Sequence, residues 1–147
     1  MTTPSIDLPI TEQVRHRVDE RGVAWITLNR PDVKNAISPD QRDRVIALLA
    51  EASADLHVRA VVLGAEGDAF CTGADLRAPR PPAPRPDDAP KRATGEVAKM
   101  IREGAQALIA AVLDCEKPVI AKVGGTAAGI GAHLALACDL VVAAEGV

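Results

Sequence analysis

The chain has 147 residues, 48% of them apolar, and a formal net charge of −3, so it is long enough to form one domain with a hydrophobic core. A protein that binds nucleic acid needs a basic face or an aromatic stacking platform. This chain is mildly acidic and has one Trp and one Phe, which argues against a nucleic-acid partner. The spacing of Cys71, Cys115 and Cys138 fits neither a disulfide framework nor a metal site, and it favours a reducing cytoplasm. Because no export signal and no run of about 18 apolar residues occurs, we expect a soluble protein with no membrane partner.

The first half of the chain predicts a β-hairpin, a helix and a further strand. Residues 13–18 and 23–28 alternate in polarity around a turn at 19–22, which is typical of a hairpin. Ser38, Pro39 and Gln41 then supply an N-cap, a proline at the first helical position and a capping-box partner. The helix that follows has one apolar face and is expected to pack on a sheet, and residues 59–63 form the next strand. That face consists of Val45, Leu48, Leu49 and Ala52.

In the second half of the chain, predicted helices and strands again alternate after a proline-rich segment. Residues 78–93 are predicted to form a mobile loop within one domain spanning residues 1–147, with a domain linker as the alternative. An amphipathic helix is expected next, then strands at 118–123 and 140–143 on either side of a short helix through Leu134 and Leu136. The apolar face of the longer helix would contain Val97, Ile101, Ala105, Leu108 and Val112. Strands that alternate with helices predict an α/β fold with mainly parallel pairing.

Two segments rich in small residues, 70–76 and 124–133, carry the functional signal. Each follows an apolar strand-like run and offers free backbone N–H groups where a helix is expected to begin. Two such donors that face each other make an oxyanion hole. Competing motifs do not fit, because the third glycine of a dinucleotide fingerprint, the Gly-Lys-Ser/Thr of a phosphate loop and the G-x-S-x-G of a hydrolase are all missing.

Four segments in order resemble the enoyl-CoA hydratase/isomerase (crotonase) family. They are residues 26–31 with 35–37, residues 69–76, residues 117–121 and residues 124–140. The resemblance implies a crotonase-like spiral of ββα units and a substrate that is an acyl-CoA thioester. Coenzyme A would be part of that substrate, with no metal and no other cofactor. It also implies a homotrimer or a dimer of trimers.

Carried over residue by residue, the resemblance assigns the two oxyanion donors to the backbone amides of Ala74 and Ile130. The carbonyl of Thr72 matches the position that binds the adenine amino group of coenzyme A. The remaining positions that match the substrate-binding turns are Gly73, Asp75, Leu76, Thr126 and Gly129.

Three departures from the family pattern bear on the reaction. His133 stands where the first catalytic glutamate is expected, and it is either a proton acceptor or a helix histidine partly buried against the loop. Ile130 replaces a glycine, and its branched side chain is expected to tolerate positive φ poorly and to crowd the acyl site. The second glutamate would lie beyond residue 143, so the chain is expected to be an N-terminal portion. A non-catalytic acyl-CoA-binding protein and an inactive fragment are therefore the alternatives to an enzyme.

Other chemically active side chains have a structural and a functional interpretation. Cys71 is expected to pack in the core rather than act as a nucleophile. Asp75 either binds substrate or caps a following helix. His16 and His57 are expected at the surface or on a strand. A basic set in and after the proline-rich segment either meets coenzyme A phosphates or is only solvated, and consists of Arg80, Arg85, Lys91 and Arg92.

Overall fold

The computed structural model describes residues 5–78 and 95–147, and its main layer is a five-stranded sheet. The strands are β1 (Val14–Val18), β2 (Val23–Leu28), β3 (Ala60–Ala65), β5 (Val119–Val123) and β7 (Leu140–Ala143), which lie in that order across the sheet. β1 and β2 form the predicted antiparallel hairpin, and the other neighbours are parallel. The α/β prediction with mainly parallel pairing is therefore confirmed.

The order of elements repeats strand–strand–helix three times. β1 and β2 precede α2 (Pro39–Ala54), and β3 and β4 (Ala69–Cys71) precede a longer helical segment. That segment consists of α3 (Glu96–Ile101), a π-helical stretch η3 (Arg102–Gln106) and α4 (Ala107–Leu113). β5 and β6 (Thr126–Ala127) precede α5 (Ile130–Leu136). Short helical turns complete the described part, namely η1 (Ser5–Asp7), α1 (Ile10–Gln13) and η2 (Pro31–Val33).

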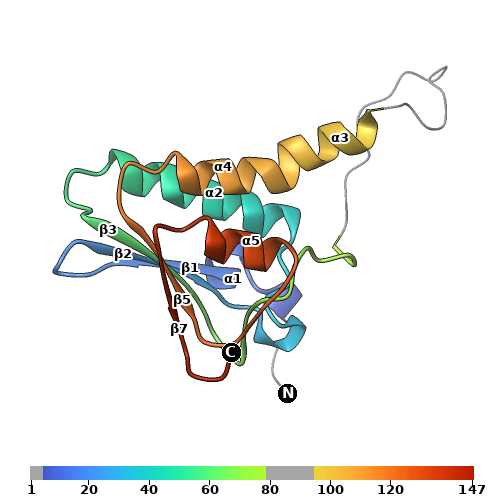
Figure 1. The fold of residues 1–147 in the computed structure, drawn as a ribbon, viewed down its shortest axis with the longest axis horizontal. Coiled ribbons are helices and arrows are strands. Elements are labelled where there is room, and N and C mark those ends of the chain that lie inside the picture. Colours follow the sequence, from blue (N-terminus) through green and yellow to red (C-terminus); the bar gives the residue numbers. More distant parts are fainter. Residues whose placement is uncertain (1–4, 79–94) are drawn as a thin grey trace.

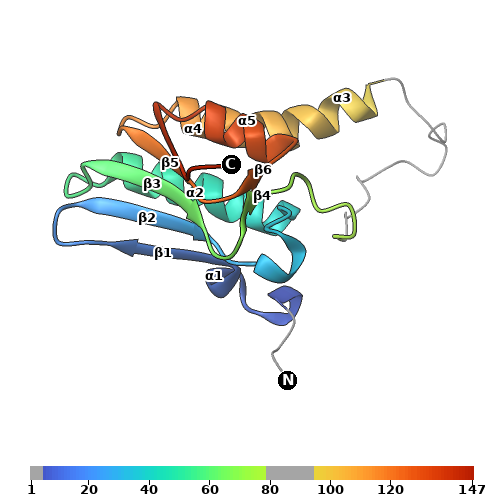
Figure 2. The ribbon, with the colours of Figure 1, turned by 60° about the horizontal axis from the view of Figure 1, so that its bottom comes forward.

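The helices and the two short strands have distinct places around the main sheet. Figure 2 shows α2, α4 and α5 on one face of it. β4 and β6 pair with each other in a separate two-stranded parallel sheet. This second sheet carries both of the turns that the sequence predicts to be functional, because each turn follows one of its strands.

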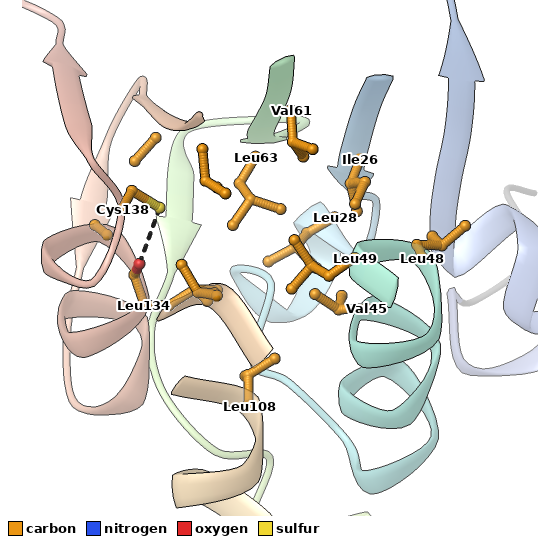
Figure 3. Packing of buried hydrophobic residues seen from close by; sticks show 14 of the residues in the cluster. Ile26, Leu28, Val45, Leu48, Leu49, Val61, Leu63, Leu108, Leu134 and Cys138 are labelled. Atoms are coloured by element: carbon orange, nitrogen blue, oxygen red, sulfur yellow. Dashed lines mark hydrogen bonds between the residues drawn. The ribbon is translucent and has the colours of Figure 1, made fainter. Parts of the chain in front are cut away.

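The core lies between the main sheet and these helices. The apolar faces of α2, α4 and α5 pack against side chains on one face of the sheet (Figure 3). These side chains include Ile26 and Leu28 from β2 and Val61 and Leu63 from β3. The predicted face of α2 is buried as expected and consists of Val45, Leu48, Leu49 and Ala52. Each fully buried Val or Leu side chain contributes about 1.5–3 kcal/mol to folding, so the contact between α2 and the sheet stabilises the fold.

The N-terminus of α2 is capped as the sequence predicts. The Gln41 N–H donates to Ser38 Oγ at 3.2 Å, and the Ser38 N–H donates to Gln41 Oε1 at 3.1 Å. Pro39 occupies the first helical position, where no N–H is needed. The capping box therefore fixes where α2 begins, immediately after the segment that contacts the first functional turn.

The helical segment 96–113 differs from its prediction in its first half. Only Leu108 and Val112 of the predicted apolar face are buried, whereas Val97 and Ile101 are exposed. The π-helical stretch explains part of the difference, because its wider turns rotate the residues before it relative to those after it. In Figure 1, α3 also extends beyond the end of α2, and its apolar side chains are exposed in the part of the chain that the structure describes.

Two sequence expectations concern features that the described residues address only in part. Apart from Ala78, the predicted proline-rich loop, and with it the basic set from Arg80 to Arg92, lies outside the described residues. Within residues 5–78 and 95–147, no helix is long and apolar enough to cross a membrane.

Candidate functional site

The first turn follows β4 and presents the amide of Ala74. Ile37 holds the residues on either side of it, since its N–H donates to the Gly73 carbonyl at 2.8 Å and its carbonyl accepts from the Asp75 N–H at 2.9 Å. In such a parallel bridge the residue between these two bonds directs its own N–H away from the partner strand. Ala74 is exposed, and among the described residues nothing accepts a hydrogen bond from its N–H.

The second turn follows β6 and presents the amide of Ile130. Gly129 adopts φ 54° and ψ −128°, a conformation that favours glycine, and α5 begins at the next residue. The first N–H groups of a helix have no partner within the helix. In the described part of the chain no loop or cap acceptor is found for the Ile130 amide.

The structure brings the two turns into contact. The Ala128 N–H donates to the Cys71 carbonyl at 2.9 Å, which extends the pairing of β4 with β6. A Cβ atom built on Gly129 would lie 3.6 Å from the Gly73 Cα, so the two glycines face each other at van der Waals distance. The geometry therefore places one turn with an unpartnered amide beside another.

The remaining predicted residues differ in exposure and contacts. Thr72 is half-buried, and both its N–H and its hydroxyl donate to the Lys34 carbonyl, at 3.2 and 3.1 Å. Leu76 and Thr126 are exposed beside or within the turns. His133 is also exposed and lies one helical turn after Ile130, on the same side of α5.

The structure corrects the expectation of strain at Ile130. Among the described non-glycine residues, only Lys34 and Asn35 have positive φ, so Ile130 does not need the conformation that a branched side chain resists. Gly129 takes that role. The Ile130 side chain is half-buried and packs against the core cluster. The expectation that it crowds the acyl site did not include this contact with the core.

Asp75 is a buried ion-pair partner rather than a helix cap. Its Oδ2 lies 3.0 Å from Arg30 Nη2, and both side chains are 2% exposed. Its Oδ1 accepts the Arg77 N–H at 3.0 Å, which closes a turn, and no helix begins there within the described residues. Burial alone would raise the pKa of Asp75, but the Arg77 N–H and the Arg30 guanidinium outweigh it and lower the pKa.

Arg30 is the residue of this region whose position sequence reasoning missed. Its side chain is almost fully buried although arginine is rarely found inside a protein. The sequence holds one indirect signal, the position of the arginine two residues after an apolar strand and directly before a proline. Its partner lies 45 positions further along the chain, and no local pattern connects the two.

Two of the cysteines, Cys71 and Cys138, are buried in the core. Cys71 is fully buried, and burial raises the pKa of its thiol. Cys138 is also buried, its Sγ donates to the Leu134 carbonyl at 3.2 Å (Figure 3), and burial raises its pKa to about 12. Since the thiolate is the reactive form, both environments favour packing over nucleophilic chemistry.

Two further features of the described residues lie apart from the turns. A shallow hollow on the β1–β2 side is lined by residues that include Arg15, Trp25 and Glu66, but by none of the predicted site residues. His16 and His57 are exposed, as expected. In residues 5–78 and 95–147, no three metal-ligating side chains of His, Cys, Asp or Glu are grouped closely enough to hold a metal ion.

Comparison with known proteins identifies the family. A probable enoyl-CoA hydratase of Rhodobacter capsulatus is 40% identical over 132 residues, which are 90% of this chain and 46% of that protein. A 1,2-epoxyphenylacetyl-CoA isomerase of Escherichia coli is 34% identical over 128 residues, 86% of this chain and 45% of that protein. The chain thus spans about half the length of the curated relatives that it matches.

Solved structures agree with this assignment. The crystal structure of a probable enoyl-CoA hydratase from Mycobacterium smegmatis superposes with a TM-score of 0.76 at 29% identity, over 89% of this chain and 48% of that one. The predicted crotonase-like fold is confirmed by this likeness. The family model described as enoyl-CoA hydratase/isomerase matches residues 19–146, and the chain belongs to the enoyl-CoA hydratase/isomerase family.

Proposed function

We propose that this chain forms the thioester-binding part of a protein that acts on acyl-CoA thioesters, by hydration or by double-bond isomerisation. The observation that carries the proposal is the contact between two glycine turns, which contain the amides of Ala74 and Ile130, and neither amide has an acceptor within residues 5–78 and 95–147. Both reactions place negative charge on the thioester oxygen. Donors fixed in advance stabilise such charge by about 10²–10³-fold in rate each.

The two glycines explain how a substrate carbonyl reaches these amides. Gly73 is buried and adopts φ 113°, and Gly129 adopts φ 54°, so neither turn carries a side chain at the point where the two approach. The thioester oxygen would accept both N–H groups there. The other substrate contacts are proposed at Thr72, Leu76 and Thr126, which border the same turns.

His133 is the group we propose for proton transfer. It lies on the Ile130 side of α5 and is exposed, and a neutral imidazole accepts a proton near neutral pH. In hydration it would take a proton from the water that bonds to the β-carbon, while the two amides hold the enolate oxygen, and the imidazolium would then give that proton to the α-carbon. No metal or redox cofactor is part of this proposal.

A non-catalytic acyl-CoA-binding protein is the second candidate. The observation that favours it is the histidine at the position where the family pattern expects a glutamate, with no hydrogen bond or ion pair to that side chain among the described residues. A cytoplasmic location and assembly as a homotrimer or a dimer of trimers are also proposed, on the family resemblance alone.

Calorimetric titration with acetoacetyl-CoA, compared with free CoA, tests the donor assignment. Acetoacetyl-CoA presents an enolate oxygen, and we expect it to bind at least about 10-fold more tightly than CoA, as analogues of a charged intermediate do. Ala74→Pro removes the one N–H and should abolish this preference, whereas Ala74→Gly keeps the N–H and should retain it.

Two outcomes decide between the candidates. Equal binding of the two ligands by the folded chain would contradict the oxyanion assignment and favour the binding protein. A clear preference for acetoacetyl-CoA would justify a turnover assay with crotonyl-CoA. In that assay, loss of hydration on His133→Ala and its return on His133→Glu would support the proton-transfer role.

A further inference from the structure

A buried polar network contacts the turn that follows β4, through Asp75. The Arg30 guanidinium donates to four acceptors, and each bond is between groups that are buried or half-buried. These acceptors are Asp75 Oδ2 at 3.0 Å, Gln41 Oε1 at 3.0 Å, the Ala36 carbonyl at 3.3 Å and Ser5 Oγ at 3.4 Å.

One end of this network is attached to the proposed oxyanion donor. Asp75 follows Ala74 in the chain, and its N–H donates to the Ile37 carbonyl at 2.9 Å. Its two carboxylate oxygens are held by Arg30 and by the Arg77 N–H. The peptide that carries the Ala74 N–H is therefore followed by a residue that is fixed by its backbone and by both side-chain oxygens.

The other end is attached to the start of helix α2. Gln41 Oε1 accepts from Arg30 and also from the Ser38 N–H at 3.1 Å, which is one half of the capping box. The bonds from Arg30 thus connect the turn to the first turn of a 16-residue helix whose apolar face lies in the core.

Stability alone gives a weak reason for this arrangement. Removing two charges from water costs several kcal/mol per ion, and apolar residues of the same volume often serve the fold as well or better. A rigid fork with several directed hydrogen bonds does supply geometric precision. A misplacement of about 1 Å at a reacting group can cost about 10²-fold in rate, so precision has value next to a donor.

We propose that Arg30 and Asp75 are positioning residues that fix the direction of the Ala74 N–H and thereby set how strongly a thioester oxygen is held. The pair acts through the Ala74 peptide and does not itself contact substrate. This inference rests on the proposed function, because it presumes that the Ala74 amide is a donor.

The experiment measures ligand preference and local order in the same variants. Asp75→Asn keeps the shape and removes the charge, Arg30→Met removes the donors, and Arg30→Lys restores one charged donor. Val112→Ala, a cavity in the core at helix α4, is the matched control for general destabilisation. The two readouts are the ratio of the dissociation constants of CoA and acetoacetyl-CoA, and the hydrogen exchange of the Ile37 and Asp75 amides, which flank the donor.

If the pair positions the donor, Asp75→Asn and Arg30→Met should lower the ratio by about 10-fold with little change in CoA affinity. Arg30→Lys should recover part of it, and Val112→Ala should leave it unchanged. Exchange at Ile37 and Asp75 should accelerate in the two pair variants by more than it does in Val112→Ala.

An unchanged ratio in folded Asp75→Asn, or an equal fall in Val112→Ala, would overturn the inference. So would a failure of all three pair variants to fold while Val112→Ala folds, because the pair would then serve the whole fold. If the unsubstituted chain shows no preference for the thioester, the proposed function fails. The exchange of the Ile37 and Asp75 amides then decides separately whether the pair orders the turn.

Discussion

Gly131 is the residue at which helix α5 meets strand β4. A Cβ atom built on it would lie 2.1 Å from the Cys71 carbonyl oxygen and 2.7 Å from the Cys71 Cβ. Neither atom belongs to a flexible side-chain end, so the helix could accept a methyl group only by moving away from the strand. Because α5 begins one residue earlier, that movement would displace the Ile130 amide from the first turn.

Gly131→Ala is therefore expected to destabilise the protein by about 1–3 kcal/mol, as overpacking does, and to weaken the preference for acetoacetyl-CoA. Urea unfolding and the two titrations measure these effects. Gly124→Ala is the matched control, because a Cβ there meets nothing within 4 Å and the residue has no positive φ. If both variants unfolded at the same urea concentration, the close approach at Gly131 would have no energetic meaning.

The two turns of the proposed site were predictable as segments of the sequence. Small residues after a strand indicate free amides, and this pattern locates the two turns at 70–76 and 124–133, whereas the assignment of the donors to Ala74 and Ile130 comes from the family resemblance. The Arg30–Asp75 pair was not predictable in the same way. A charged residue in a sequence is normally assigned to the surface, and only the fold brings these two side chains together across 45 positions.

Helix α2 begins at a capping box that also contacts the buried arginine. Ser38→Ala removes the acceptor of the Gln41 N–H and should lower the free energy of unfolding by about 1 kcal/mol. Ser38→Gly is expected to lower the free energy of unfolding by only a few tenths of a kcal/mol, because glycine suits the cap conformation and leaves the N–H open to water. Urea unfolding of the two variants and of the unsubstituted chain checks these values, and a Ser38→Ala variant as stable as the unsubstituted chain would show that the Ser38 hydroxyl bond contributes little.

Most elements could be read from the sequence because their signals are local. The hairpin turn, the α2 cap and the apolar faces of β5 and α2 depend on neighbours within a few residues. For the segment 96–113, the prediction of a buried apolar face was wrong in the first half, because burial there depends on what packs against the helix. Val97 and Ile101 have the spacing of a buried face, yet they are 65% and 44% exposed.

The two edges of the main sheet differ in chemistry. β1 presents Arg15 and Arg17 to solvent, and charged side chains of this kind hinder pairing with another strand. β7 forms the opposite edge, and its four residues are all exposed and apolar. An exposed apolar edge strand is a site of association, so we expect the chain to associate in a concentration-dependent way through β7.

Val142→Glu should reduce this association without loss of stability. Val142 pairs with Lys122 across the β5–β7 register, so the new carboxylate would lie beside a lysine, and opposite charges on neighbouring strands attract. Sedimentation velocity over a range of concentrations measures the effect. Leu56→Glu is the control, since Leu56 is 91% exposed in the loop after α2 and the change in net charge is the same. Equal loss of association in both variants would assign the effect to net charge, and a wild-type chain that stays monomeric throughout would show that the β7 edge is protected.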